Sequence, residues 1–368
     1  MIIYYKDILY MFLFTLIAGI FCTRYIVTSE NSVINTGDIP RYEQFIERVA
    51  IGNMFFDIIE SEDLPSYILS DTNVLSIEED VEISLDLFDL QRDPVWNLDR
   101  IDQRSGKLDK KYFYNSKAGE SVNVFVLDTG IDTSHQEFKG RASWGTNTVD
   151  NDNINLHPHG THVAGTIGSE TYGVAKKTNL IAVKVLNKDG GGTSSSVLKG
   201  IEYVINDDRR KKIINMSLGG GYSQALNRAV EIAVQKGVIV VSAAGNENQD
   251  ACNTSPGSSP ETITVGAFGQ VDNIAYFSNW GSCVDIFAPG VDIWSTMPGG
   301  GVGKMSGTSM ATPMTAGVVA LLIDGDAEYT PEKVKQFLKK TATKNMLKGD
   351  LRGSPNDMIF SIPAFFFQ

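Results

Sequence analysis

The sequence lacks an excess of positive charge and any internal repeat. Its 32 Lys and Arg residues stand against 44 Asp and Glu residues, a formal net charge of −12, which argues against nucleic acid as a partner. No repeat of about 20–50 residues is evident. The chain has 368 residues, of which 42% are apolar and 21% charged, a composition typical of a soluble globular protein. This length allows one large domain and a smaller one.

The sequence also lacks an apolar run long enough to cross a membrane. Residues 8–21 are strongly apolar, but they fall short of the about 20 residues that a membrane helix needs. They follow Lys6, as the apolar core of a signal peptide follows a basic residue. We therefore predict a signal peptide over residues 1–22, entry into the secretory pathway and no stable membrane span. Asp7 and the missing small-residue cleavage motif leave a retained anchor as the alternative.

Cysteine is scarce. Of the 3 cysteines, Cys22 falls in the predicted signal peptide. Cys252 and Cys283 therefore remain, either as a pair in an oxidising compartment or as two buried thiols.

Residues 24–89 have the pattern of a small α+β module, and this part of the chain carries the acidic charge. Residues 30–93 contain 16 acidic and 3 basic side chains, whereas residues 94–368 contain 27 of each. The patterns predict strands at residues 25–27, 54–59 and 74–85, and helices at residues 41–49 and 62–69. Residues 91–103, with Pro94 and Trp96, are expected to form an exposed connection.

Beyond this connection, continuous apolar runs alternate with helical patterns. The runs are residues 122–127, 180–186, 213–216, 238–243 and 263–265, and the helical patterns include residues 195–205 and 223–235. Such alternation predicts an α/β fold with a mostly parallel sheet and helices on both faces. Glycine-rich links at residues 190–192, 219–221 and 299–303 predict loops where the backbone approaches a ligand closely.

Residues 307–313 combine a glycine, hydroxyl residues and small neighbours, and they lead into the apolar run 316–323. This pattern presents one hydroxyl at a helix N-terminus, where the helix dipole favours developing negative charge. Its serine, Ser309, is a candidate nucleophile. A serine is weak at neutral pH and needs a base that a third group holds in place.

All 4 histidines lie before residue 163, so an imidazole base must come from that region. His159 stands at the entrance of an expected helix, whereas His162 one turn further is expected to be a hydrogen-bonded core residue. Asp128 ends a buried strand, where an open α/β sheet places its functional groups, and Asp132 is the nearby alternative. An α/β-hydrolase is excluded because its histidine follows its serine.

Asn246 follows the apolar run 238–243 directly. In that position it can aim a side-chain N–H at a substrate carbonyl, and the alternative is an ordinary turn residue.

Three segments, residues 126–130, 159–165 and 307–313, resemble the active-site signatures of subtilisin-like serine proteases. Residues 243–246 and 217–220 resemble the family's oxyanion and substrate-binding segments, and residues 171–178 and 219–223 are similar to the proteinase K branch. The resemblance covers residues 92–345.

The resemblance implies a role for each matched residue. Asp128 orients His159, His159 is general base and then general acid, and Ser309 is the nucleophile. Asn246 and the backbone N–H of Ser309 form the oxyanion hole. No cofactor is implied for catalysis, the expected partners are protein or peptide substrates, and the enzyme is expected to work as a monomer outside the cell or at its surface.

The resemblance also implies a zymogen. Residues 23–90 are similar to the family's inhibitory propeptide, a ferredoxin-like α+β domain that acts as an intramolecular chaperone and that the enzyme removes itself. Residues 74–80 resemble the last core strand of that propeptide. Cleavage is expected between Leu85 and Arg92, which leaves residues 91–368 as the peptidase domain and sheds the acidic charge.

Substrate binding is predicted at nine residues, because small residues and exposed backbone suit an extended peptide that adds as a strand. They are Ser217, Leu218, Gly219, Gly220, Gly191, Gly192, Ala243, Ala244 and Gly245. A roomy apolar pocket predicts a broad preference for an aromatic or aliphatic residue before the cleaved bond. No acidic cluster in the sequence marks a pocket for Lys or Arg.

Two structural features follow from the proteinase K branch alone. Some of its members bridge positions that match Cys252 and Cys283. Asp285, with the carbonyls of Pro260 and Thr262, matches one of its calcium sites, and hard oxygen ligands suit calcium. A surface Asp285 without metal is the alternative.

Two rival functions remain. One is a metal-dependent hydrolase, because His157-x-His159-x-x-His162 has ligand-like spacing. It leaves Ser309 and Asn246 without a role. The other is a binding or structural protein on a retired protease fold, although every catalytic position is filled.

Overall fold

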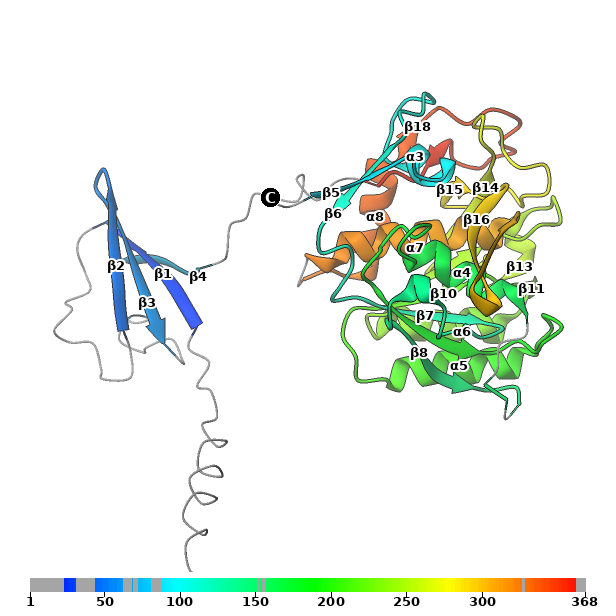
Figure 1. Cartoon of the computed structure of the whole chain (residues 1–368), viewed down its shortest axis with the longest axis horizontal. Helices are drawn as coiled ribbons and strands as arrows, with labels where there is room; N and C mark the ends of the chain where they lie inside the picture. Colours follow the sequence, from blue (N-terminus) through cyan, green and yellow to red (C-terminus); the bar gives the residue numbers. More distant parts are fainter. Residues whose placement is uncertain are drawn as a thin grey trace, which may run out of the picture. The chain divides into compact units, whose positions relative to one another are not determined.

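The structure, a computed structural model, describes residues 23–30, 44–61, 68, 72–80, 88–150, 152–153, 157–325 and 328–361. The chain divides into two compact units, Met1–Leu85 and Asp86–Gln368 (Figure 1). Strand β5 (Phe88–Arg92) pairs with β6 (Lys111–Asn115), so the second unit begins slightly earlier than the predicted peptidase domain. The predicted signal peptide, and the predicted helix at 62–69 apart from Ile68, lie outside the described residues.

The first unit is a four-stranded antiparallel sheet in the order β2-β3-β1-β4. Its strands are β1 (Thr23–Ser29), β2 (Gln44–Ile51), β3 (Met54–Ser61) and β4 (Val74–Glu79). Val27, Ile59 and Ile68 form its buried core. The strands predicted at residues 25–27 and 54–59 are confirmed, and so is the part of the predicted strand 74–85 that β4 forms up to Glu79; residues 81–85 lie outside the described residues.

The helix predicted at residues 41–49 is wrong, because residues 44–51 form strand β2. Gly52, with a φ of +65°, lies at the turn that joins β2 to β3. A two-residue Gly-Asn link favours a hairpin over a continuing helix. Arg48 pairs across the hairpin with the buried carboxylate of Asp57, its register partner on β3. The apolar residues of this segment therefore alternate between the faces of a sheet.

The second unit is built on a nine-stranded sheet in the order β18-β19-β15-β14-β12-β10-β7-β9-β8. The strands are β7 (Asn123–Asp128), β8 (Ala142–Asn147), β9 (Asn179–Lys184), β10 (Lys212–Met216), β12 (Ile239–Ala243), β14 (Ile263–Phe268), β15 (Ile286–Pro289), β18 (Thr343–Lys344) and β19 (Asp357–Met358). All neighbours run parallel except β18 and β19. The prediction of a mostly parallel sheet is confirmed.

Helices cover both faces of this sheet, as the alternation of strands and helices predicts. Val124 and Val126 of β7 pack with α4 (Pro158–Gly168) and α7 (Thr308–Asp324). Phe125 and Leu127 point the other way, toward α5 (Ser194–Asn206) and α6 (Gln224–Gln235). Successive side chains of a strand alternate between its faces, so one apolar run supplies both cores.

The segment predicted as an exposed connection contains a buried helix, α3 (Trp96–Ile101), so that prediction is wrong. Leu98 and Ile101 have no exposed surface. Arg100 is also buried, and its Nε donates to Asp272 Oδ1 at 2.8 Å. A six-residue helix is too short to show a clear period, and paired charges make it look polar in sequence.

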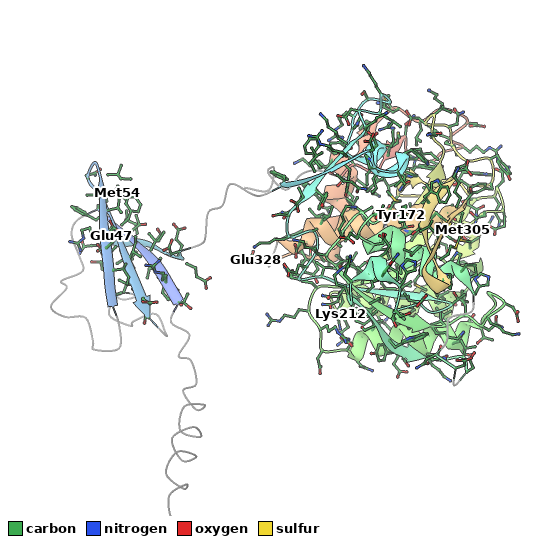
Figure 2. All side chains as sticks on the ribbon, in the orientation of Figure 1. Glu47, Met54, Tyr172, Lys212, Met305 and Glu328 are labelled. Carbon is green, nitrogen blue, oxygen red and sulfur yellow. A yellow bond between two sulfur atoms is a disulfide. The ribbon has the colours of Figure 1, made fainter. Side chains whose placement is uncertain are left out.

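Apart from helix α8, the remaining elements are short. They are β11 (Gly220–Gly221), β13 (Thr254–Ser255), the hairpin β16 (Ile293–Met297) and β17 (Gly301–Met305), helix α8 (Pro331–Thr341), and the 3₁₀ turns Gln136–Phe138, Ala251–Asn253 and Pro298–Gly300. The loop predicted at residues 299–303 is thus a turn that runs into a strand. Figure 2 draws the side chains of both units and labels Met54 at the start of β3 and Met305 at the end of β17. Within the described part of the chain, no helix combines the length and apolar character needed to span a membrane.

Candidate active site

The last residue of β7 meets the first turn of α4. His159 Nδ1 lies 2.8 Å from Asp128 Oδ1 and 2.9 Å from Asp128 Oδ2. Asp128 is fully buried, and the Thr129 N–H donates to its Oδ1 at 2.7 Å. Asp132 instead accepts hydrogen bonds from Ser134 and from the Gly299 N–H. The structure therefore brings Asp128, and not Asp132, to His159.

The start of α4 is held by capping and by close backbone approach. His157 Nδ1 accepts a hydrogen bond from the His159 N–H at 3.2 Å, and Pro158 occupies the first turn. Both features favour a helix start at this point. The Gly160 N–H donates to Thr129 Oγ1 at 3.1 Å. These contacts fasten the helix start to the end of β7 and hold His159 over Asp128.

The electrostatics of His159 are set by two opposing effects. Burial favours the neutral ring, but the negative charge of Asp128 and its hydrogen bond outweigh burial, so the pKa of His159 is raised above its ordinary value. A neutral ring that donates from Nδ1 to the carboxylate has Nε2 as its acceptor. His159 is therefore suited to take up a proton at Nε2.

His162 lies in the core and is confirmed as a hydrogen-bonded core residue. It has no exposed surface, and its Nε2 lies 2.9 Å from the carbonyl oxygen of Ile293. Burial lowers the pKa of His162 to about 4. The three histidines of the rival metal site thus have separate partners, since His159 binds Asp128 and His157 caps α4.

Ser309 is the second residue of α7, at the end where the helix presents free backbone N–H groups. Its hydroxyl donates to the carbonyl oxygen of Ser217 at 3.1 Å, and the Ser217 hydroxyl donates to the Ser309 carbonyl at 2.9 Å. Helix α7 packs against both α4 and β10, the strand that leads into Ser217. Two helices on one face of the sheet thus carry His159 and Ser309 to the same side of the molecule.

Asn246 is fixed at the N-terminus of α7. Its Oδ1 accepts hydrogen bonds from Thr308, from the backbone N–H at 2.8 Å and from Oγ1 at 3.0 Å. The oxygen of the amide is used in this way, so its Nδ2 group is the half that can donate to a ligand. Asn246 and Ser309 line the same pocket.

Two adjoining pockets form a cleft across these residues. The first, about 260 Å³, is lined by Leu218, Gly219, Gly220, Gly221, Ala243, Gly245, Asn246, Glu247, Gln249, Thr254, Thr308 and Ser309. The second, about 500 Å³, is lined by His159, His157, Ser217, Gly191, Gly192 and their neighbours, and it shares residues 218–221 with the first. Eight of the nine predicted substrate-binding residues therefore line the cleft.

Ala244 is the exception among the predicted substrate-binding residues. It is fully buried, and its backbone bonds to Val265 and to the side chain of Asn279 behind the pocket. Glu247, which sequence reasoning missed, lines the first pocket, and its Oε2 accepts a hydrogen bond from Asn279 Nδ2 at 2.9 Å. Glu247 directly follows Asn246 in the sequence, and this neighbourhood could have indicated that it lines the pocket.

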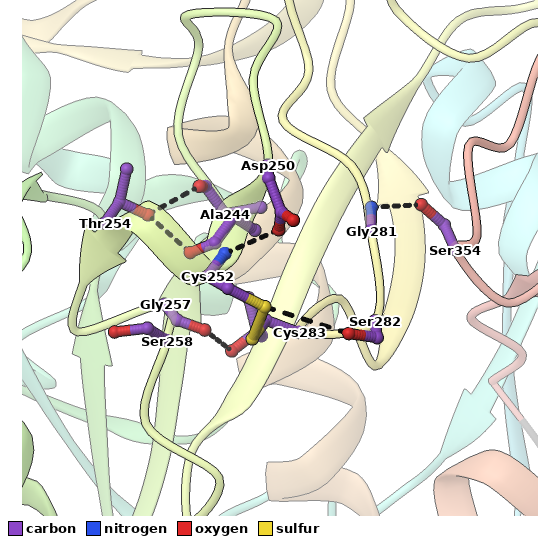
Figure 3. The surroundings of a disulfide bond; sticks show 12 residues. Ala244, Asp250, Cys252, Thr254, Gly257, Ser258, Gly281, Ser282, Cys283 and Ser354 are labelled. Carbon is purple, nitrogen blue, oxygen red and sulfur yellow. Dashed lines mark hydrogen bonds between the residues drawn. A yellow bond between two sulfur atoms is a disulfide. The ribbon is translucent and has the colours of Figure 1, made fainter.

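Cys252 and Cys283 form a disulfide, as predicted (Figure 3). Figure 3 also shows Thr254, whose Oγ1 donates to the carbonyls of Ala244 and Ala251. Thr254 lines the first pocket. The disulfide therefore fastens the chain next to the pocket wall to the segment that leads into β15.

The predicted calcium ligands converge on a lysine. Lys335 Nζ donates to the carbonyl oxygens of Pro260 and Thr262 at 2.8 and 2.7 Å, and it lies 2.9 Å from Asp285 Oδ2. Lys339 Nζ lies 2.7 Å from Asp285 Oδ1. These three groups do not fit a calcium ion here, because an ammonium takes all of them. Across the described residues, no group of three or more His, Cys, Asp or Glu side chains suits a metal.

The chain is similar in sequence to known proteases over the region that contains the site. Residues 119–354 match the model of the subtilase family. Subtilisin-like protease 4 of Arthroderma benhamiae is 45% identical over 282 residues, which cover 75% of this chain and 70% of that protein. Alkaline serine exoprotease A of Vibrio alginolyticus is 40% identical over 361 residues, which cover 92% of this chain and 67% of that protein.

A solved structure gives the same picture for the fold. The crystal structure of a cold adapted subtilisin-like serine proteinase matches with a TM-score of 0.71 and 46% identity, over 73% of this chain and 99% of that one. At 46% identity the two proteins are alike in sequence as well as in fold.

Proposed function

The chain belongs to the subtilase family of serine proteases, and from that premise we propose that Asp128, His159 and Ser309 form its catalytic triad. The observation that carries the proposal is the contact of His159 Nδ1 with both carboxylate oxygens of Asp128, beside the cleft that Ser309 also lines. A buried acid, an imidazole and a serine in these roles activate a hydroxyl for attack on a carbonyl.

In the proposed first step, Ser309 Oγ attacks the peptide carbonyl while His159 Nε2 takes the hydroxyl proton. The Asp128 carboxylate stabilises the imidazolium that forms. His159 then gives this proton to the leaving amine, and an acyl-enzyme remains on Ser309. A water molecule, deprotonated by His159, hydrolyses the ester and restores the serine.

Substrate binding prepares the serine. The Ser309 hydroxyl donates to the Ser217 carbonyl. An extended peptide that pairs with the backbone of residues 217–220 competes for that carbonyl with its own N–H. The hydroxyl is then free to turn toward His159.

The negative charge on the attacked carbonyl oxygen is assigned to two donors. They are the Asn246 Nδ2 group and the backbone N–H of Ser309 at the N-terminus of α7. Preorganised donors of this kind stabilise a developing oxyanion strongly because they need no reorientation during the reaction. The hydrogen bonds from Thr308 to Asn246 Oδ1 support this assignment, since they fix which half of the amide is the donor.

We propose a broad preference for an aromatic or aliphatic residue before the cleaved bond. Gly219, Ala243 and Gly245 leave the first pocket wide, and Leu218 adds an apolar wall. Glu247 is the acidic group in its lining, and its Oε2 accepts a hydrogen bond from the Asn279 amide.

We propose that the first unit is an inhibitory, chaperoning propeptide that the enzyme removes in the secretory pathway. The match to alkaline serine exoprotease A covers 92% of the chain, more than the second unit alone contains. A cut between Leu85 and Phe88 leaves β5 paired with β6. The disulfide supports an oxidising, extracellular destination for the enzyme.

Mass spectrometry of the wild type and of Ser309→Ala, both secreted from a eukaryotic host, tests this function. The wild type is expected to begin between residues 86 and 92, while the variant keeps its propeptide. Retention of the propeptide by both proteins contradicts self-processing. Loss from both assigns the cut to another protease, and peptide hydrolysis by the two proteins then decides the role of Ser309.

A further inference from the structure

We propose that Lys335 is a built-in cation that replaces a structural calcium ion in this chain. Its ammonium occupies an oxygen cage whose chemistry suits calcium, and it clamps helix α8 to the loop before β14. The family resemblance implies a metal at this place, and the residues that surround it imply that none is needed.

The three donors of the Lys335 ammonium match the three oxygens around it. A lysine ammonium has three N–H donors. Lys335 Nζ meets three oxygens, those of Pro260 and Thr262 at 2.8 and 2.7 Å and Asp285 Oδ2 at 2.9 Å. The exposed fraction of the side chain is 15% for Lys335 and 11% for Asp285, so water competes little for this ion pair.

The carboxylate of the cage already has positively charged partners. Asp285 supplies one negative charge, and two ammonium groups, of Lys335 and Lys339, contact its two oxygens. The Thr264 N–H donates to Asp285 Oδ2 as well, at 2.9 Å. A calcium ion usually takes six to eight oxygen ligands, often with several carboxylates. Here both oxygens of the cage's one carboxylate already face an ammonium group, so a divalent ion would have to displace Lys335.

Lys335 connects helix α8 to the segment between β13 and β14. Pro260 and Thr262 lie in the segment between β13 and β14, and β13 begins at Thr254 on the wall of the first pocket. Lys335 reaches that segment from α8, which packs on the core through Val334 and Leu338. The lysine therefore braces the loop behind the substrate pocket without any supply of metal.

Thermal unfolding of the full chain in a Ser309→Ala background tests the clamp, because this background neither digests itself nor depends on activity. Lys335→Ala is compared with Lys340→Ala, which removes an exposed lysine from the same helix. In a calcium chelator we expect Lys335→Ala to melt about 5 °C or more below Lys340→Ala, since it leaves the carbonyl of the buried Thr262 and one oxygen of Asp285 without this donor.

Calcium provides the decisive second arm. Millimolar Ca²⁺ is expected to raise the melting temperature of Lys335→Ala more than that of Lys340→Ala, because the emptied cage takes the ion. Asp285→Ala added to Lys335→Ala is expected to abolish this extra gain. If the alanine variant does not fold, Lys335→Met, which keeps a long apolar side chain but removes the charge and the donors, replaces it.

Three results overturn the proposal. The first is equal melting of Lys335→Ala and Lys340→Ala, which means that there is no clamp. The second is a destabilised Lys335→Ala that gains no more than Lys340→Ala from calcium, which means that the cage is not a cation site. The third is a calcium gain in the unsubstituted background that Asp285→Ala removes, which means that the ion and not the lysine occupies the cage.

Discussion

Gly160 faces the backbone of Gly130 so closely that a Cβ atom on Gly160 would lie 2.1 Å from the Gly130 carbonyl oxygen. The same Cβ atom would lie 3.2 Å from Asp128 Oδ1. This approach sets the separation between the end of β7 and the start of α4. The distance between Asp128 and His159 therefore depends on the absence of a side chain at residue 160.

Gly160→Ala is expected to lower kcat/KM by about 100-fold, because it pushes α4 away from β7 and misplaces His159. The matched control is Gly325→Ala at the end of α7, where a Cβ atom meets nothing within 4 Å. Peptide hydrolysis and circular dichroism on both variants separate loss of activity from loss of fold. Full activity of Gly160→Ala contradicts the account of this contact.

The pH dependence of kcat/KM is expected to follow His159. Only the neutral ring accepts a proton, so activity falls as the pH drops below the His159 pKa, which Asp128 raises above its ordinary value. Asp128→Asn removes the charge, so the acidic limb moves to lower pH, and turnover falls by about 10⁴-fold. Asp132→Asn serves as the control and should leave the limb where it is. An unmoved limb in Asp128→Asn counts against the assignment.

Replacement of Asn246 separates its two roles. Asn246→Asp keeps the oxygen that accepts from Thr308 but loses the Nδ2 donor, whereas Asn246→Ala loses both. Both variants are expected to lose about 10²–10³ in kcat with a small change in KM, a magnitude known from subtilisin, a member of the same family. Melting temperatures show which variant also disturbs α7. A near-normal kcat in both variants would falsify the oxyanion role.

Glu247 makes the specificity of the first pocket testable. We expect the wild type to cleave after Phe much better than after Lys, because the pocket is wide and Glu247 is exposed to water and hydrogen-bonded to Asn279. Glu247→Gln should lower the residual cleavage after Lys by up to about 5-fold, as for an exposed ion pair, and leave cleavage after Phe unchanged. A wild type that prefers Lys contradicts the apolar assignment.

The disulfide is expected to contribute to stability and not to chemistry. Cys252 and Cys283 are 31 residues apart, and a link of this length contributes about 3–4 kcal/mol in the chain-entropy model. The double variant Cys252→Ser with Cys283→Ser should unfold at lower denaturant concentration. At low temperature it should keep its kcat, and a large loss there indicates that the link shapes the pocket directly.

The sequence predicted the parts of the fold that rest on long uniform patterns. The apolar run ending at Asp128 identifies β7, because a strand buried on both faces needs apolar residues at every position. Residues 44–51 were misassigned because helix and strand periods are hard to separate in a short segment, and the turn at Gly52 decides between them. Helix α3 was missed because its charged residues are buried, Arg100 against Asp272 and Asp99 against Gln103 and backbone N–H groups.

The same limit applies to the site. Motif segments pointed to Asp128, His159 and Ser309, the residues of the proposed triad, because each carries its own local pattern. Lys335 gave no such signal, since it lies more than 70 residues along the chain from Pro260 and Thr262. The contacts of the cage exist only after α8 packs against the loop before β14. Cation sites that use carbonyls and a distant lysine leave no motif.

The proposed function depends above all on Ser309 as the nucleophile that His159 activates. Peptide mapping by mass spectrometry after reaction with a fluorophosphonate tests it most directly. We expect one adduct, on the peptide that contains Ser309. It should be absent from Ser309→Ala, and it should form much more slowly in His159→Ala. An active enzyme that stays unlabelled, or one labelled at another residue, contradicts it.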